Sequence, residues 1–224
     1  MIDIEPLWLT LKLATVTTII LFVIAVPFAN WLSQERNNFK TVIEAIVSMP
    51  LVLPPSVLGF YLLLAFSPSQ WFGKFLEQHF DIRLVFSFPG LVIASVIYSL
   101  PFMMFPLQSG FNSLSPALRE ASYSLGKSKW QTLIKVVLPN IKPSLLSGLV
   151  LTFAHTIGEF GVVLMIGGNI PGQTKVASIA VYDEVESMNY HSANMYAMIL
   201  FVTTFVILLT LYFINHRFDR RRAA

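Results

Sequence analysis

The sequence predicts an all-α membrane protein with five transmembrane helices, because its few charges are separated by long apolar stretches. Hydrophobic residues make up 55% of the 224 residues and charged residues only 12%, whereas about a quarter of the residues in a soluble domain are charged. Four stretches contain no Asp, Glu, Lys or Arg, and each exceeds the ~20 residues that a helix needs to cross a bilayer. They cover residues 13–34, 45–73, 84–118 and 187–216.

A fifth apolar stretch, residues 143–166, contains only two titratable side chains, His155 and Glu159. We therefore expect one transmembrane domain over residues 1–224, with no soluble domain of any size. The expected spans lie near 9–31, 42–66, 88–108, 143–166 and 193–214.

The basic residues predict an outside N-terminus and an inside C-terminus. Eleven of the fifteen Lys and Arg residues fall on one side of a five-span arrangement, which the positive-inside rule makes cytoplasmic. A six-span arrangement would divide them between the two faces, and we reject it. The eleven are Arg36, Lys40, Arg119, Lys127, Lys129, Lys135, Lys142, Arg217, Arg220, Arg221 and Arg222. The acidic residues expected outside are Asp3, Glu5, Glu77, Asp81, Asp183, Glu184 and Glu186.

Composition also excludes several classes of function. The isoelectric point near 9.2 reflects basic residues beside spans, without the basic and aromatic platform of a nucleic-acid binder. The chain begins acidic, and its first apolar run is too long for a cleavable signal peptide. It has no cysteine, which excludes disulfides and thiolate metal sites. We expect no cofactor.

The segment 115–139 is a polar, basic island that predicts two short helices and a tight turn. A serine–proline pair at 115–116 suits a helix start. Gly126 can take the left-handed conformation that ends this helix. Ser128 and Gln131 predict a capping box for the second helix, which we expect to stop before Pro139.

The same segment resembles the "EAA" signature of permease subunits of bacterial ATP-binding-cassette importers. The matching positions are Glu120, Ala121, Ser122, Gly126, Val136, Leu138 and Pro139. Ser122 replaces the second alanine of the signature, and Val136 replaces an isoleucine. The resemblance implies a coupling loop that docks into a groove on a cytoplasmic ATP-binding subunit. The alternative is an ordinary amphipathic helix pair on the membrane surface.

The second expected span contains three prolines within six residues, Pro50 to Pro55. Each proline removes a backbone donor, so a straight helix is excluded. Inside a bilayer a broken helix is tolerated only where protein or a water-filled cavity covers the freed carbonyls. The segment is therefore either a structural kink or the lining of a pathway. The candidate lining residues are Pro54, Pro55, Ser56, Thr152 and Thr156.

His155 and Glu159 are four residues apart in the fourth expected span, which places them on one helix face. Glu159 in lipid would cost roughly 2.5–3.5 kcal/mol, so we expect it to face the bundle interior and to have a hydrogen-bond partner. Gly158 and Gly161 suit close helix approach. A zinc hydrolase would need a third ligand, and the other histidines, at positions 79, 191 and 216, lie outside the spans. We expect no metal, and a structural and a functional role for Glu159 both stay open.

Residues 167–174 imitate a phosphate-binding loop, but Gln173 stands where the phosphate-binding lysine is required. The loop follows a span that emerges on the outer face, and no other ATPase motif is present. We expect no ATPase activity from this chain. The loop is instead a candidate contact for a substrate-delivery protein.

Residues 49–55, 158–161 and 168–174 together resemble permease subunits of molybdate importers, over nearly the whole chain. Sulfate permeases share the Gly-Glu-Phe-Gly portion and are longer. The resemblance implies a homodimer in the bacterial inner membrane, two cytoplasmic ATP-binding subunits and a soluble molybdate-binding protein outside. Import would proceed by alternating access, with sulfate or tungstate as alternative substrates.

The apolar spans are consistent with an oxyanion pathway. No Lys or Arg lies deep in the spans, so a dianion finds no fixed countercharge that would trap it, and weak contacts favour rapid passage. A membrane-anchored assembly or receptor protein without transport is the remaining alternative. Such a protein has no reason to carry a coupling segment.

Overall fold

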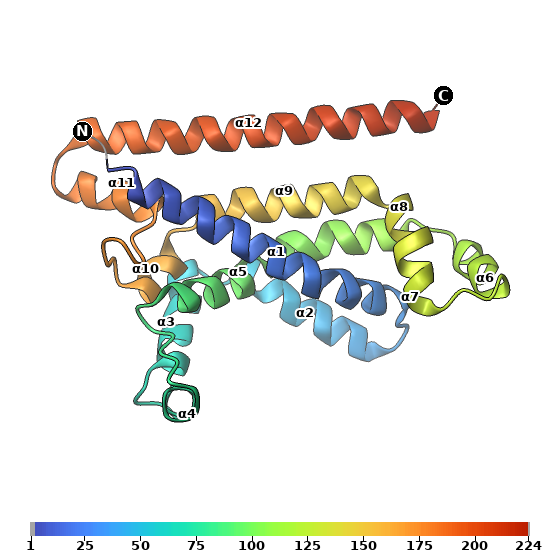
Figure 1. Cartoon of the computed structure of the whole chain (residues 1–224), viewed down its shortest axis with the longest axis horizontal. Helices are drawn as coiled ribbons and strands as arrows, with labels where there is room; N and C mark the ends of the chain where they lie inside the picture. The colour runs from blue at the N-terminus through green and yellow to red at the C-terminus, as the bar shows by residue number, and fades with distance from the viewer. Residues whose placement is uncertain (1–2, 224) are drawn as a thin grey trace.

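The computed structural model describes residues 3–223, with side chains described up to residue 215. The described part consists of helices and their connections (Figure 1). They are α1 (Glu5–Gln34), α2 (Asn38–Val52), α3 (Pro55–Phe66), α4 (Trp71–Phe80), α5 (Phe88–Asn112), α6 (Pro116–Ser124), α7 (Lys129–Thr132), the π-helix η1 (Leu133–Val137), α8 (Leu138–Asn140), α9 (Lys142–Gly158), α10 (Gly161–Gly167), α11 (Ala177–Glu186) and α12 (Tyr190–Ala223).

The centre of the bundle is formed by α1 and α5, with α9 packed against both. Leu13, Leu21 and Leu32 follow one side of α1 and are almost completely buried. They belong to two core clusters, one at each half of the bundle. The cluster around Leu13 includes residues of α10. The cluster around Leu21 and Leu32 includes Leu133 and Val137 of the π-helix η1. The core therefore holds the segment between α7 and α8 against the long helices.

Helix α12 lies along the outside of this bundle (Figure 1). Its apolar residues are mostly exposed within the chain, and its described contacts are made with α9 and α11. Tyr196 donates a hydrogen bond to the backbone oxygen of Asp3 (2.8 Å), and Asn215 donates one to Ser147 (3.0 Å). These two bonds tie α12 to the bundle near both ends of the part whose side chains are described, while many of its apolar side chains between them stay exposed.

Three helices, α1, α5 and α12, are long and apolar enough to cross a membrane, and the number rises to five if each bent pair counts as one span. The second expected span is one such pair, because α2 and α3 meet at 110°. The expected fourth span is not continuous. Helix α9 ends at Gly158, and α10 begins only at Gly161.

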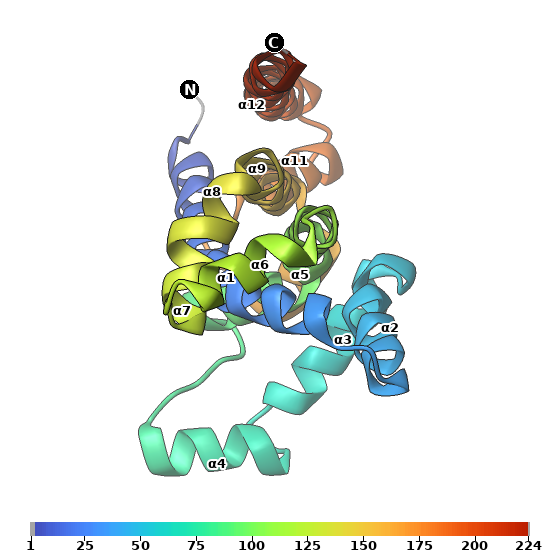
Figure 2. The same ribbon diagram turned by 90° about the vertical axis from the view of Figure 1, so that its right-hand side faces the viewer.

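The loops that carry most basic residues gather at one end of the bundle (Figure 1). The α1–α2 connection, the segment α6–α8 and the end of α12 lie there, whereas the N-terminus and α11 lie at the opposite end. The side chains of Arg217 and residues 220–222 lie outside the described residues. Helix α4 forms an arm away from the bundle and runs across the direction of α12, as Figures 1 and 2 together show.

Candidate functional site

The helical hairpin α6–α7 is built by the local signals that its sequence contains. Gly126 has φ +76°, and its N–H donates to the oxygen of Tyr123 (2.9 Å), which ends α6. The side chain of Ser128 accepts a hydrogen bond from the N–H of Gln131 (3.2 Å), and Gln131 Oε1 accepts one from the N–H of Ser128 (3.1 Å). The predicted turn and capping box are confirmed. Ser115 precedes α6 but makes no side-chain capping bond.

The expectation that the second helix stops before Pro139 is wrong. The chain continues from α7 through η1 into α8, which contains Pro139. In η1 the N–H of Leu138 bonds to the oxygen of Leu133, so the wider π turn accommodates a residue that has no N–H. The side-chain amide of Asn140 donates a hydrogen bond to the backbone oxygen of Val136 (2.7 Å) one turn earlier. The chain then bends by 83° into α9.

Two buried hydroxyl groups join the helices of the hairpin. Ser122 Oγ and Thr132 Oγ1 lie 2.8 Å apart, and both residues are buried. At the tip, by contrast, two large apolar residues are exposed to solvent, Leu125 with 79% and Trp130 with 61% of its surface accessible. The hairpin thus combines a buried hydroxyl pair between its helices with an exposed apolar tip. Of the other signature residues, Glu120, Ala121 and Pro139 are exposed and Leu138 is half-buried.

A second candidate site lies where the breaks of two helices meet. The break between α2 and α3 is at Leu53 and Pro54, and the break between α9 and α10 is at Glu159 and Phe160. A Cβ atom on Gly161 would lie 2.9 Å from Cβ of Pro55, so only glycine allows this approach. The structure thus confirms that Gly161 suits close packing. Gly158 differs, because a Cβ atom there would meet nothing within 4 Å.

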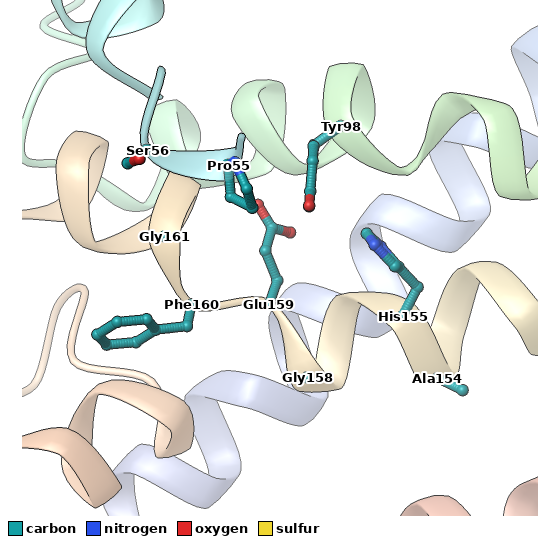
Figure 3. A pocket seen from close by; sticks show the side chains of 9 residues that line it. All are labelled: Pro55, Ser56, Tyr98, Ala154, His155, Gly158, Glu159, Phe160 and Gly161. Carbon is teal, nitrogen blue, oxygen red and sulfur yellow. The ribbon is translucent and has the colours of Figure 1, made fainter. Parts of the chain in front are cut away.

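A cavity of about 590 Å³ opens beside this junction (Figure 3). The carboxyl group of Glu159, the hydroxyl group of Tyr98 and the ring of His155 point toward it (Figure 3). Its lining contains no Lys or Arg. The lining residues are Pro55, Ser56, Tyr98, Ala154, His155, Gly158, Glu159, Phe160 and Gly161.

Glu159 does not share a helix face with His155, which corrects the expectation from their spacing. Its backbone is extended, with φ −67° and ψ 130°, because α9 ends one residue earlier. The two side chains nevertheless line the same cavity. Glu159 is only 4% exposed, yet neither carboxyl oxygen makes a hydrogen bond of normal geometry with a described residue. The hydroxyl group of Ser95 on α5 lies near enough to interact with this carboxyl group, so the expected partner is present, in a looser geometry than a normal hydrogen bond.

A chain of hydrogen bonds orients His155. The hydroxyl of Thr156 donates to the oxygen of Thr152 (2.9 Å), so Thr156 Oγ1 accepts from Ser99 at 3.1 Å. Ser99 Oγ must then accept from Nδ1–H of His155, also at 3.1 Å. The ring is stacked on Phe102, with centroids 3.7 Å apart. This order places the proton on Nδ1 and leaves Nε2 free.

The same contacts place Thr152 and Thr156 away from the cavity. Both are buried in α9, and Thr156 contacts α5 through Ser99. Neither threonine lines the cavity, and neither does Pro54, whereas Pro55 and Ser56 do. Within the described chain Thr156 therefore joins α9 to α5, whereas the hydroxyl group of Thr152 makes no hydrogen bond with a described residue.

The loop after α10 is held rigidly at its base. Thr174 Oγ1 donates to the oxygen of Gly167 (2.7 Å), and the amide of Asn169 donates to the carboxylate of Asp183 (2.9 Å). Residues 171–173 at its tip are exposed. The loop thus presents a preformed surface at the end of the bundle opposite the hairpin.

Comparison with known proteins identifies the family to which the chain belongs. Residues 22–224 match the family described as binding-protein-dependent transport system inner membrane component. The chain belongs to this family. It is a multi-pass protein of the cytoplasmic membrane and a permease subunit of a transport system.

Two relatives and one solved structure illustrate the similarity. The permease is 44% identical to the molybdenum transport system permease protein ModB of Azotobacter vinelandii, over 94% of this chain and 93% of that protein. It is 32% identical to the sulfate transport system permease protein CysT of Escherichia coli K12, over 95% of this chain and 76% of that protein. A bacterial ABC transporter that imports alginate has the same fold (TM-score 0.77, 18% identity), over 96% of this permease and 79% of that chain.

The residues that α5 contributes to the permease cavity are not among those predicted from the sequence. Tyr98 lines the cavity, while Ser99 and Phe102 orient His155. With Ser95 they occupy positions i, i+3, i+4 and i+7, which is one face of a helix. This spacing of polar and aromatic residues within an uncharged span is the signal that could have identified them.

The Ser122–Thr132 hydrogen bond of the permease hairpin leads to a test by double substitution. We expect Ser122→Ala to destabilise the chain by about 1–3 kcal/mol, because the buried hydroxyl of Thr132 loses its partner. Adding Thr132→Val removes that unpaired group and should restore most of the loss. Thermal unfolding in detergent measures both. A double variant that is less stable than Ser122→Ala would contradict this role for the pair.

Proposed function

We propose that this permease is the transmembrane subunit of an ATP-driven molybdate importer. The observation that carries the proposal is the 44% identity to a molybdenum permease along almost the full length of both chains. The sulfate permease is less similar and longer, so sulfate is the weaker alternative, and tungstate resembles molybdate too closely to be separated from it here. Uptake of molybdate by cells that lack their own importer tests the assignment. Restored uptake of sulfate but not of molybdate would transfer the assignment to sulfate.

The proposed assembly contains two copies of this chain, two cytoplasmic ATP-binding subunits and an extracytoplasmic molybdate-binding protein. The hairpin α6–α7 would contact the ATP-binding subunit through its exposed tip, Leu125 and Trp130. The loop tip at 171–173 would contact the binding protein. Their positions at opposite ends of the bundle support this division (Figure 1).

The proposed topology has five spans, with the N-terminus outside and the C-terminus inside. Three of these spans would be the long helices α1, α5 and α12. The bent pair α2–α3 and the helix α9, which belongs to the second bent pair, would be the other two. The cysteine-free chain allows a direct test with single cysteines at Leu125 and Gln173. A membrane-impermeant thiol reagent applied outside intact cells should label Gln173→Cys only. Labelling of Leu125→Cys from outside would show that the chain has the opposite orientation in the membrane.

The cavity between the two broken helices is the proposed section of the pathway. Its lining has no cationic side chain, so it cannot hold a dianion tightly, which suits a transit site. The open side at Gly158 would face the second copy, since nothing in the described chain covers that glycine. Ser56, Tyr98, His155 and Glu159 are the polar groups that a passing anion and its water would meet.

Glu159 gives a prediction that separates assembly from transport. Neither carboxyl oxygen has a hydrogen bond of normal geometry, and the Ser95 hydroxyl is the one described donor near enough to interact with it, so Glu159→Ala deprives a single hydroxyl group of a weak contact. We therefore expect Glu159→Ala and Glu159→Gln to reach the membrane at levels within about twofold of the unaltered chain. Molybdate uptake at matched levels then shows what the carboxyl group does in the cavity. Loss of membrane insertion in both variants would show a structural role instead.

A further inference from the structure

A small pocket lies at the end of the bundle that carries the hairpin. Its volume is about 270 Å³, and it lies between the end of α1, the end of α5 and the start of α6. Polar and apolar groups both contribute to its wall. The lining residues are Ser33, Gln34, Arg36, Phe111, Asn112, Leu114, Pro116 and Arg119.

Two arginines give this pocket an uncompensated positive charge. Neither Arg36 nor Arg119 forms an ion pair among the residues with described side chains. Their acidic neighbours in sequence, Glu35 and Glu120, do not line the pocket. An anion bound in this pocket would therefore contact two positively charged side chains and would not compete with a carboxylate for them.

Arg119 is held in place before any ligand arrives. One guanidinium nitrogen donates to Asn30 Oδ1 (2.8 Å), and the guanidinium group lies over the ring of Phe111, 5.9 Å from its centroid. A guanidinium group has five N–H donors, so most of them remain for a ligand. Arg36 is exposed and can close on the same ligand.

Aromatic side chains mark the depth of the pocket in the membrane. Trp31 is 40% exposed and stacks on Phe28, with centroids 5.8 Å apart. Tryptophan at the end of a span is typical of the membrane–water interface. Gln34 in the pocket wall lies one helical turn beyond Trp31, on the same face of α1. The pocket thus adjoins the lipid-facing surface at the level of the headgroups.

We propose that the Arg36–Arg119 pocket binds the phosphate group of an anionic phospholipid. Arginine forms paired hydrogen bonds with phosphate oxygens, and basic pockets between helices at a membrane interface select anionic headgroups. The volume accommodates a headgroup but not acyl chains, which would lie along α1 beside Trp31. The proposal rests on the membrane location of the chain and not on the identity of its transported ion.

The test counts phosphatidylglycerol bound to the full-length chain in detergent, by native mass spectrometry. We expect phosphatidylglycerol to be retained where phosphatidylcholine is lost. Arg36→Gln, which removes no described contact, should lower retention about tenfold, whereas Arg36→Lys should stay within about threefold. Lys135→Gln is the matched control, because it removes an exposed charge at the same end of the bundle outside this pocket.

Equal retention of phosphatidylglycerol by the unaltered chain and by the double variant Arg36→Gln/Arg119→Gln would overturn the proposal. Displacement of the lipid by excess inorganic phosphate would also overturn it, because the ligand would then be a free anion. Unchanged lipid retention with lost binding of the ATP-binding subunit would assign the arginines to that partner and contradict a lipid site. The readouts are lipid retention and binding of the ATP-binding subunit, so none of these results depends on which ion is transported.

Discussion

A valine at position 126 should lower molybdate import at least about tenfold while the chain still reaches the membrane. Gly126 has φ +76°, and a Cβ atom there would meet nothing within 4 Å. The effect of Gly126→Val is therefore conformational, since a β-branched residue in the left-handed region costs of order 1–3 kcal/mol. The turn between α6 and α7 would change its backbone conformation, and the two helices would no longer form a single apolar tip.

The measurement is ATP hydrolysis by the partner subunit in response to loaded binding protein, together with uptake. Gly126→Asn is the matched control, because asparagine tolerates the left-handed conformation better than other residues with a Cβ atom. It should retain most of the activity. Normal uptake by Gly126→Val would rule out a coupling function for this turn.

A methyl group at position 161 should also abolish most transport, for a steric reason. A Cβ atom on Gly161 would lie 2.9 Å from Cβ of Pro55 and 3.3 Å from the backbone nitrogen of Ser56. Gly161→Ala therefore forces apart the two helix breaks that border the cavity, at a cost of about 1–3 kcal/mol. Neighbouring backbone atoms cannot move aside as the end of a flexible side chain would.

Gly158 provides the control within the same Gly-Glu-Phe-Gly segment. It is the last residue of α9, and alanine there would meet nothing within 4 Å in this chain. Gly158→Ala should therefore insert and fold normally, with thermal unfolding close to that of the unaltered chain. Equal unfolding temperatures and equal uptake for Gly158→Ala and Gly161→Ala would contradict the steric argument.

Local signals in the sequence were sufficient where the structure depends on neighbouring residues. The left-handed Gly126 and the capping box of Ser128 and Gln131 are determined by short-range geometry, and the sequence predicts them correctly. The prolines around Pro54 likewise predict the break between α2 and α3. These features need no knowledge of the rest of the fold.

Features that depend on packing between distant segments could not be predicted in the same way. The break at Glu159 follows no proline, and it occurs where Gly161 packs against Pro55 from another helix. The π-helix before Pro139 buries Leu133 and Val137 in the core cluster that also contains Leu21 and Leu32 of α1. Helical spacing alone therefore assigned Glu159 to the wrong face, and the local effect of Pro139 placed the end of the second helix too early.

The assignment as a molybdate permease is tested most directly in proteoliposomes that contain this chain, its ATP-binding subunit and the soluble binding protein. ATP hydrolysis and uptake are measured with the binding protein loaded with molybdate, loaded with sulfate, or empty. We expect molybdate-loaded protein to stimulate both, and Gly126→Val to abolish the stimulation. Stimulation by sulfate-loaded protein alone, or hydrolysis that does not depend on the loaded binding protein, would contradict the assignment.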